Sequence, residues 1–498
     1  MQKKAGVILS YLLIFFKIIV TFFYIPFVLG SIGKDKYGLF TVVSSIIAYI
    51  AILDFGLNDS TLRYFVKFKS SKDSNEKNSI LSAVSKIYTV VSILMISVII
   101  VIYLLLDEIF LNSFTVNELV LLKKMYLVSG VSIFFTIFFN PISAILNAHE
   151  KFIFLKSLEL ISFFLTTVVI VIFLKQGYGV YEMVLITASV NILILLLKYL
   201  YCLKTLKINF PHFRKSNLYI KELLYYGSPI FVVIIVEQIY WKLDNILIGS
   251  LLGTTFVTYY AMGVVFQKYI LSFSTAISRI MTPNMISQID SSSKPNILNE
   301  FIKISRLQLI IISFISLNLI LWGREFLVIW LGKDYEQSYA ILILIMIPFT
   351  IENIGNVRNI ILQVYKLYWL RAIIILIISI LNIAATYILL NKIGLVGAAL
   401  STALSLMLGY IFTNILLWKK VKLKMQKFFI NVWLKAIPIY FIISLAVIVS
   451  KKIYMYQVIS WFSLIFCVVI TGILYSLLIW FFYLNKNEKN KLKKIISR

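Results

Sequence analysis

Cysteine, histidine and acidic residues are scarce in this sequence, and each scarcity excludes a kind of protein. The 498 residues contain two Cys and two His, and only 21 are Asp or Glu. Cys202 and Cys467 are far apart, and each lies at or in a hydrophobic segment, so a disulfide scaffold is excluded. His149 and His212 both lie in polar segments between apolar runs, so no histidine metal site is expected.

A phosphate-binding loop is also missing. The Gly-Lys pairs at Gly33 and Gly332 lack both the preceding glycine spacing and the following hydroxyl residue of that motif. We therefore expect no ATP hydrolysis, no cofactor and no catalytic residues in this chain.

Charged residues of either sign are too few for a water-soluble protein. Only 14% of the residues are charged, whereas 61% are hydrophobic, and the mean hydropathy is +0.94. The net charge of +27 comes from short basic clusters between apolar runs. This placement favours a membrane topology signal over nucleic-acid binding.

The sequence contains fourteen apolar runs long enough to cross a membrane as helices. A span needs about 20 mainly apolar residues, and the runs are continuous, so strands are not expected. The first run follows Lys3 and Lys4 and is too long for a signal-peptide core, so we interpret it as a retained helix. The runs cover residues 6–30, 39–61, 80–106, 119–146, 152–174, 181–203, 222–250, 254–282, 303–322, 338–364, 371–391, 395–417, 430–450 and 459–484.

The basic residues predict the orientation. With these boundaries, 32 Lys and Arg lie at or between helix ends on the side of the termini, whereas 8 lie on the opposite side. Because positively charged loops stay in the cytoplasm, both termini are expected there, and the protein is expected in the bacterial inner membrane.

Several loop motifs recur at a nearly constant spacing. Gly33 is repeated at Gly253, 220 residues later, and Gly177 at Gly394, 217 residues later. We therefore predict two six-helix bundles, residues 1–203 and 222–420, related by a pseudo-two-fold axis along the membrane normal. Residues 204–221 would form a cytoplasmic linker, and residues 421–498 would add two helices and a basic tail.

Charged residues inside the runs are the main candidates for function. Each ionised side chain in a bilayer is costly, so such residues often line a wet cavity or have a partner. Lys17, Lys242 and Lys268 are candidate substrate-binding cations, and Glu237 and Asp244 are candidate coupling or gating acids. The 220-residue spacing relates Lys17 to Glu237, which predicts a pair that opens when substrate binds. A static packing pair is the alternative for Lys17, and snorkelling is the alternative for Lys242 and Asp244.

Further candidates lie at the cytoplasmic ends of the runs. Asp54 begins the sequence Asp-Phe-Gly-Leu, with Arg63 nine residues later, and Arg279 ends the eighth run. We assign Asp54 to coupling or gating and the two arginines to substrate binding, with an ordinary helix end as the alternative for residues 54–63. Glu159 is interpreted as an interfacial residue without a special role.

Taken in order, these motifs resemble the polysaccharide repeat-unit flippases that serve O-antigen or capsule synthesis. These flippases belong to the multidrug/oligosaccharidyl-lipid/polysaccharide exporter superfamily. The resemblance implies a carrier that moves an undecaprenyl-diphosphate-linked oligosaccharide to the outer leaflet through a cationic cavity between two six-helix bundles. The matching segments are Gly30 to Gly38, Asp54 to Leu57 with Arg63, Gly227 to Pro229, Asp244 to Gly253 and Gly394 to Ala399.

Two other functions remain open at this point. A cation-coupled exporter of drugs or other small molecules would use Glu237 or Asp54 to bind the ion. A membrane glycosyltransferase or polymer ligase is disfavoured by the short outward loops. The expected partners are the lipid-linked oligosaccharide, membrane lipid and a polysaccharide polymerase, but no nucleic acid.

Overall fold

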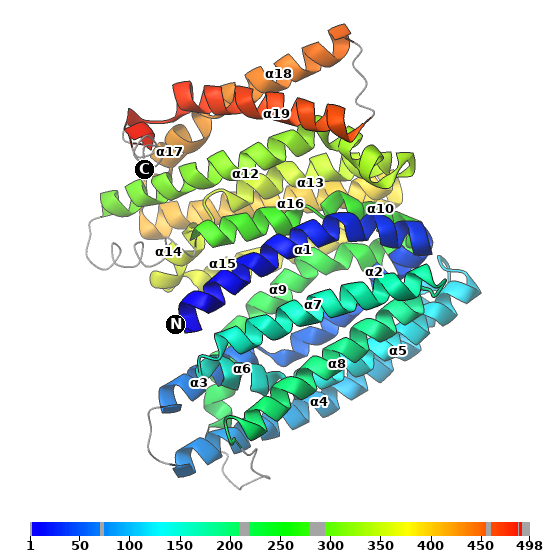
Figure 1. Ribbon diagram of the computed structural model, residues 1–498. Coiled ribbons are helices and arrows are strands. Elements are labelled where there is room, and N and C mark those ends of the chain that lie inside the picture. The colour runs from blue at the N-terminus through cyan, green and yellow to red at the C-terminus, as the bar shows by residue number, and fades with distance from the viewer. Residues whose placement is uncertain are drawn as a thin grey trace. The chain divides into compact units, whose positions relative to one another are not determined.

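The computed structural model describes residues 2–69, 74–208, 219–278, 294–454, 460–486 and 488–490, and every regular element in these ranges is helical (Figure 1). The all-α prediction is therefore confirmed. Eleven helices in the described part of the chain are long and apolar enough to cross a membrane, or up to twelve if one bent pair is a single span. The run at 254–282 extends beyond the described residues, and several side chains of the run at 222–250 are not described, so the count of fourteen stays a prediction.

The chain divides into two compact units, Met1–Thr258 and Tyr259–Arg498. Helix α9, the first helix of the expected second bundle, packs against α2, α3 and α4 within unit 1. The expected linker at 204–221 lies mostly outside the described residues, so the division into bundles at that point stays a prediction. The helices of unit 1 are α1 (Gln2–Ile32), α2 (Lys34–Ile50), η1 (Ala51–Asp54), α3 (Leu57–Lys69), α4 (Ser74–Phe110), α5 (Val116–Phe138), α6 (Asn140–Ala148), α7 (Phe152–Lys175), α8 (Val180–Lys204), α9 (Ile220–Leu252) and the start of α10 (Thr254–Val264).

Unit 2 continues from α10 through a helical stretch at 267–278. Its further helices are α12 (Lys294–Leu331), η2 (Lys333–Gln337), α13 (Ser338–Asn353), α14 (Arg358–Val364), α15 (Tyr368–Ile393), α16 (Leu395–Leu416), η3 (Leu417–Val421), α17 (Met425–Phe429), η4 (Ile430–Leu434), α18 (Ile437–Tyr454), α19 (Trp461–Leu478) and η5 (Ile479–Tyr483).

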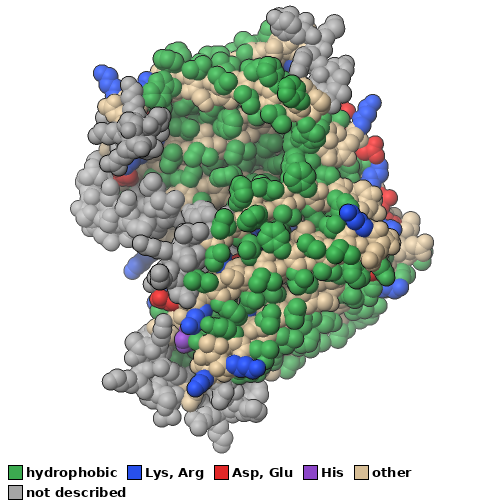
Figure 2. Space-filling model, viewed as in Figure 1, with side chains coloured by type: hydrophobic (Ala, Val, Ile, Leu, Met, Phe, Trp, Pro, Cys, Tyr) green, Lys and Arg blue, Asp and Glu red, His purple; other side chains and the backbone are tan. Residues whose placement is uncertain are grey.

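Hydrophobic side chains cover much of the outer surface of the helices. Figure 2 shows them over the middle stretches, whereas Lys, Arg, Asp and Glu gather toward the helix ends. Exposed residues such as Phe23, Leu104, Phe441 and Phe462 are each more than 60% accessible. Such a surface is stable in lipid and unstable in water.

Two glycine turns 220 residues apart have similar backbone conformations. Gly33 and Gly253 have φ angles of 81° and 95°, and each directly precedes a helix, α2 and α10 respectively. Glycine is favoured there because it adopts positive φ without steric strain. A Cβ on Gly38 would lie 1.9 Å from the carbonyl oxygen of Thr254, so α2 can approach the start of α10 only with glycine at that position.

Several predicted spans are broken helices. The run at 39–61 is divided into α2, η1 and α3, and the run at 119–146 into α5 and α6, where Pro141 occupies the first turn of α6. Proline fits there because the first turn does not need its missing N–H group. In unit 2, α13 and α14 are bent by 46° at a break that contains Gly355, whose φ is 90°. Broken helices in membrane proteins are tolerated where other groups satisfy the freed backbone atoms.

The last two helices are attached to α12 by one cation at each end. Near the start of α12, Arg306 donates hydrogen bonds of 2.9 and 2.8 Å to the Glu488 carboxylate. Near its other end, Lys451 of α18 donates a 2.6 Å hydrogen bond to Glu325 and lies 4.3 Å from the Trp322 ring centroid. The predicted appendage at 421–498 is thus anchored to a helix of unit 2.

Candidate functional site

A cluster of charged side chains joins α1 to α7 in unit 1. The Lys17 ammonium lies 3.4 Å from Oε1 of Glu159, and Oε2 of the same carboxylate accepts a 2.8 Å hydrogen bond from Lys156. The side chains of Lys17, Glu159 and Lys156 are 42%, 41% and 36% exposed. One carboxylate is therefore shared by two ammonium groups, and all three groups are accessible on unit 1.

Aromatic contacts hold Lys17 beside α7. The ring of Phe16 packs edge-on against Phe164 with 5.5 Å between centroids, and the Lys17 ammonium lies 5.9 Å from the Phe163 centroid. The two phenylalanines of α7 follow Glu159 by about one helical turn. They therefore hold α1 against the part of α7 that carries the carboxylate.

A third lysine, Lys198 of α8, lies within electrostatic range of this cluster. Lys198 donates a 3.3 Å hydrogen bond to the Ser143 hydroxyl of α6 and interacts electrostatically with Glu159 and Lys156. Four helices, α1, α6, α7 and α8, thus contribute to one group of polar side chains. We call Lys17, Lys156, Glu159 and Lys198 the lysine cluster.

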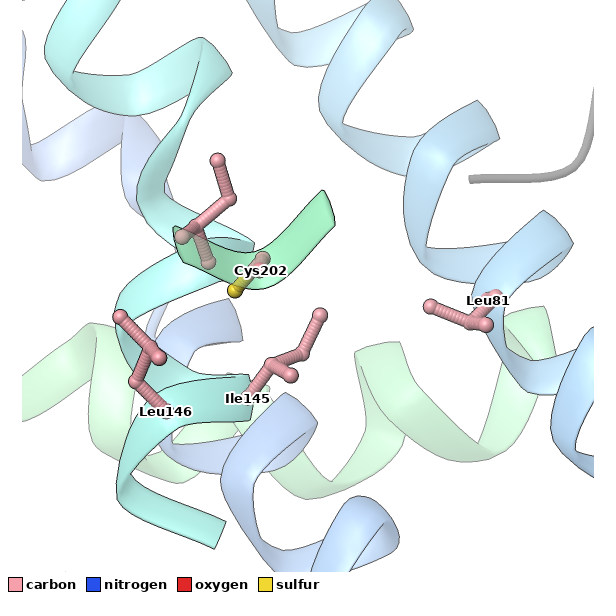
Figure 3. Packing of buried hydrophobic residues seen from close by; sticks show 5 residues of the cluster. Leu81, Ile145, Leu146 and Cys202 are labelled. Carbon is pink, nitrogen blue, oxygen red and sulfur yellow. The ribbon is translucent and has the colours of Figure 1, made fainter. Parts of the chain in front are cut away.

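Apolar packing fixes α6 against α8 beside the lysine cluster. Figure 3 shows Ile145 and Leu146 of α6 next to Cys202 of α8, with Leu81 of α4 pointing toward them. These side chains are nearly or fully buried, and Ile142 completes the group. Because Ile142 adjoins Ser143 and Cys202 lies one turn after Lys198, this packing sets the distance between the serine and the lysine.

Asp54 lies where two broken spans of unit 1 meet. Its Oδ1 accepts hydrogen bonds from Asn140 at 2.6 Å and from the Tyr88 hydroxyl at 3.1 Å, and its Oδ2 accepts one from the Asn58 backbone at 3.4 Å. The side-chain amide of Asn58 also donates a 2.5 Å hydrogen bond to Oδ1 of Asn140. These bonds join η1, α3, α4 and α6 in a polar junction.

Unit 2 contains a neutral counterpart of this junction. Gln308 of α12 donates a 3.1 Å hydrogen bond to the Ser274 carbonyl and accepts one of 2.9 Å from the Gly355 backbone at the α13–α14 break. The Ser274 hydroxyl donates to the Asn353 carbonyl at 2.8 Å. Ser274 and Gln308 lie 220 residues after Asp54 and Tyr88, so two positions of this junction match positions of the junction in unit 1.

Unit 2 also contains a buried charged cluster. The Arg358 guanidinium lies 2.5 Å from Glu352, and Arg371 lies 3.8 Å from the other carboxylate oxygen. Arg358 also donates 2.8 Å to the Glu352 carbonyl and lies 4.9 Å from the Tyr410 ring centroid. The side chain of Arg358 is 1% exposed, so this arginine cluster is part of the interior of unit 2.

The other predicted residues of unit 1 lie on helices that do not contribute to the lysine cluster. Arg63 is an exposed residue of α3, beside Tyr64, which donates a 3.0 Å hydrogen bond to Glu222 of α9. Lys242 is partly buried on α9, and Asp244 is 5% exposed. Lys242, Asp244 and Arg63 keep their predicted roles as proposals.

Of the three remaining predicted residues, only Lys268 has a described side chain. In unit 2, Lys268 is exposed and lies 5.3 Å from the ring centroid of Tyr269. Arg279 lies outside the described residues, and only the backbone of Glu237 is described, within α9. The proposed pair of Lys17 and Glu237 stays a prediction, whereas Glu159 is the carboxylate that contacts Lys17.

Sequence reasoning gave no role to Glu159, Lys156 or Lys198. The available signal was the spacing of Lys156 and Glu159, because residues three apart on a helix share a face. A charged pair at that spacing within an apolar run indicates a buried or bound polar group. Within the described ranges, no three His, Cys, Asp or Glu side chains are grouped so that they could hold a metal ion.

Comparisons with known proteins identify the fold and the family. Residues 32–340, more than half of the chain, match the family described as polysaccharide biosynthesis protein. A protein of Shigella flexneri that is named as an O-antigen transporter is 22% identical over 400 residues, which cover 78% of this chain and 92% of that protein.

Two solved structures show the same fold over most of the chain. The lipid II flippase MurJ in an inward closed conformation is similar with a TM-score of 0.71 and 19% identity, covering 96% of this chain and 99% of MurJ. An inward-facing multidrug resistance transporter of the MATE family has a TM-score of 0.69 and 13% identity, covering 81% of this chain and 93% of its own.

Proposed function

This chain belongs to the polysaccharide biosynthesis protein family, and we propose that it is a lipid-linked oligosaccharide flippase. The substrate would be an undecaprenyl-diphosphate-linked repeat unit, moved from the cytoplasmic to the outer leaflet of the bacterial inner membrane for O-antigen or capsule synthesis. The family match carries the proposal. The accessible lysine cluster supports it, because an anionic head group needs cationic partners inside a membrane protein.

The proposed topology has fourteen spans with both termini in the cytoplasm. Residues 1–203 and 222–420 would form the two bundles, 204–221 the linker and 421–498 the appended helices. The positive-φ turns at Gly33 and Gly253 and the two polar junctions support the repeat. Cysteines placed at Asn112 and Lys333 should react with an impermeant reagent from outside intact cells, whereas cysteines at Ser74, Ser216 and Lys422 should not.

The proposed substrate-binding residues are cations, and the proposed gating residues are acids. Lys17, Lys242, Lys268, Arg63 and Arg279 would bind the anionic substrate, and Asp54, Glu237 and Asp244 would control opening. The Lys17–Glu159 contact supports the role of Lys17, since its ammonium lies at an accessible site. The burial of Asp244 and the hydrogen bonds of Asp54 support a conformational role for the two acids.

The membrane potential can drive the proposed step. A diphosphate carries about two negative charges, and moving each outward across 100 mV gains about 2.3 kcal/mol. No nucleotide would be needed, and the chain would have neither ATPase nor glycosyltransferase activity. A polysaccharide polymerase and other proteins of the pathway would act on the exported product.

A second candidate is a cation-coupled exporter of small molecules. The observation that favours it is Asp54, a carboxylate held by three donors between broken helices, because such a group could bind a proton or a sodium ion. The similarity to a multidrug transporter concerns the fold alone. A membrane ligase has no supporting observation in the described residues.

Deletion of the gene separates these functions. The flippase proposal expects lipid-linked oligosaccharide to accumulate on the cytoplasmic side, where periplasmic glycosidases cannot reach it. The exporter proposal expects no accumulation and greater drug sensitivity, and a ligase would leave its lipid-linked substrate on the outer side. Restoration by a plasmid copy of the wild-type gene is the control.

A further inference from the structure

The lysine cluster has more positive than negative charge. Three lysines and one glutamate from α1, α7 and α8 give two net positive charges when all four side chains are ionised. We infer that Lys156 and Lys198, together with Lys17, bind the two phosphates of a polyprenyl diphosphate, and that Glu159 occupies the site until the diphosphate displaces it. This inference rests on the proposed flippase function and specifies its binding site.

The geometry of Glu159 is that of an exchangeable counter-ion. One oxygen is hydrogen-bonded to Lys156 at 2.8 Å, whereas the other is 3.4 Å from Lys17, which is long for a charged hydrogen bond. The carboxylate is 41% exposed, so an incoming anion can approach it without unfolding a helix. A diphosphate has more oxygen acceptors than one carboxylate and can contact several ammonium groups at once.

Charge balance favours a diphosphate over a single carboxylate. Glu159 supplies one negative charge to the three lysines, whereas a diphosphate that takes its place supplies about two and leaves less positive charge uncompensated. Uncompensated charge in the low-dielectric surroundings of a membrane protein is unfavourable, so a divalent anion gains energy there. The Ser143 hydroxyl, which accepts a hydrogen bond from Lys198 at 3.3 Å, can rotate to donate to a phosphate oxygen.

Glu159 would also prevent the site from holding its ligand too tightly. When the diphosphate leaves, the carboxylate can return to Lys17 and Lys156 and restore their charge balance. Removing the carboxylate should therefore strengthen binding and slow release. A purely structural ion pair predicts the opposite, because its loss would only loosen the contact between α1 and α7.

Helix α12 contains a matched control pair. Glu300 and Lys303 form a pair with the same three-residue spacing and a 2.8 Å contact, and both partners lie on this one helix. Glu300→Gln removes the carboxylate that pairs with a lysine, as Glu159→Gln does. It should leave diphosphate affinity unchanged.

The test measures binding of undecaprenyl diphosphate to the purified full-length protein. Lys156→Gln and Lys198→Gln should each weaken binding about tenfold, and Glu159→Gln should tighten it about fivefold. Unchanged affinity in all three variants would overturn the inference. The gain of affinity in Glu159→Gln keeps the test decisive even where a lysine variant folds poorly.

Further ligands identify the source of the anion. Inorganic pyrophosphate should bind weakly with the same ranking of variants, since the lipid contributes its own contacts. Phosphatidylglycerol vesicles should not compete at equal phosphate concentration. If they displace undecaprenyl diphosphate fully, the cluster binds anionic lipid head groups in general, and the assignment to the substrate diphosphate is wrong.

Flux in proteoliposomes separates this inference from the proposed function. Normal flux by the wild type with no effect of the three substitutions on binding would reject the site and keep the flippase. Binding that follows the predicted ranking without any flux would reject the flippase and keep the diphosphate site.

Discussion

Each unit places one carboxylate between two cations, yet the two clusters differ in exposure and in the helices that form them. In unit 1, Lys17, Lys156 and Glu159 are 36% to 42% exposed. In unit 2, Arg358, Arg371 and Glu352 are 1%, 16% and 18% exposed. Helices α7 and α15, which contribute to the two clusters, begin 216 residues apart. Lys156 and Arg371 come from these matching helices, but the carboxylates do not, since Glu159 lies on α7 and Glu352 on α13, so one cluster is accessible and a differently built one is closed.

The choice of cation agrees with this difference. Lysine is a flexible, strongly hydrated point charge, whereas the planar guanidinium of arginine suits buried contacts with carboxylates, carbonyls and rings. Arg358 contacts the carboxylate and carbonyl of Glu352 and the ring of Tyr410. We therefore assign binding to the lysine cluster and stability to the arginine cluster, and the following experiments test that assignment.

The largest expected effect is on the stability of unit 2. Glu352→Gln leaves Arg358 as an uncompensated buried charge, and loss of one partner of a buried pair costs about 3 to 5 kcal/mol. Thermal unfolding in detergent, monitored by the increase in light scattering or cysteine reactivity, should shift sharply to lower temperature. Glu159→Gln should shift it little, because exposed pairs contribute less than about 1 kcal/mol. Equal shifts in the two variants would contradict the distinction between the clusters.

The polar junctions give the next largest difference. Asp54→Ala removes the acceptor for Asn140 and Tyr88, and each buried polar group left unpaired costs about 1 to 3 kcal/mol. Ser274→Ala in unit 2 removes one hydroxyl donor to the Asn353 carbonyl, and Gln308 keeps its bond to the Ser274 backbone. Hydrogen exchange should therefore increase around α3 and α6 in the first variant and change little around the α13–α14 break in the second. The reverse order would contradict the central position of Asp54 in its junction.

Local patterns predicted part of this arrangement. Continuous apolar runs identified the helices, and the recurring glycine motifs identified turns at Gly33 and Gly253, where glycine is needed because few other residues adopt positive φ. Asp54 was recognisable because a carboxylate at the end of an apolar run needs partners. Its partners Tyr88 and Asn140 were not, since they lie 34 and 86 residues away and only helix packing brings them near.

The partner of Lys17 shows the same limit. The 220-residue spacing selected Glu237, and that pairing stays a prediction, but the spacing could not show that α1 packs beside α7, where Glu159 contacts Lys17. Neighbouring helices are decided by the burial of side chains along their whole length, which a motif of two charged residues does not encode. The break between α13 and α14 was missed for a related reason, because Gly355 alone does not distinguish a bend from a close helix contact.

The smallest expected effect concerns the C-terminal anchor, which is intermediate between the two clusters. Arg306 is 3% exposed and its partner Glu488 is 27% exposed. Burial opposes ionisation of Glu488, but hydrogen bonds from Arg306 and from the Asn485 backbone outweigh it and lower the pKa of Glu488 below its ordinary 4.5. A lowered pKa stabilises the folded state above pH 4.5, and this contribution is lost as the pH falls below that value.

Proteolysis of the C-terminal segment can detect this loss. Cleavage by an acid-active protease should accelerate modestly between pH 5 and pH 3 in the wild type, since the contribution of a partly exposed pair is about 1 kcal/mol or less. Glu488→Gln should cleave faster at pH 5 and show a flatter pH dependence. An identical pH dependence in both proteins would show that Glu488 does not hold the segment.

Transport in proteoliposomes tests the central claim most directly. Purified protein should translocate an undecaprenyl-diphosphate oligosaccharide without nucleotide, faster when the receiving side is made electrically positive, and Lys17→Gln should abolish this flux while the protein remains folded. Lys303→Gln, which removes an exposed lysine of α12, should leave the flux unchanged. Full flux in Lys17→Gln, or a strict requirement for ATP in the wild type, would contradict a potential-driven flippase whose binding site is the lysine cluster.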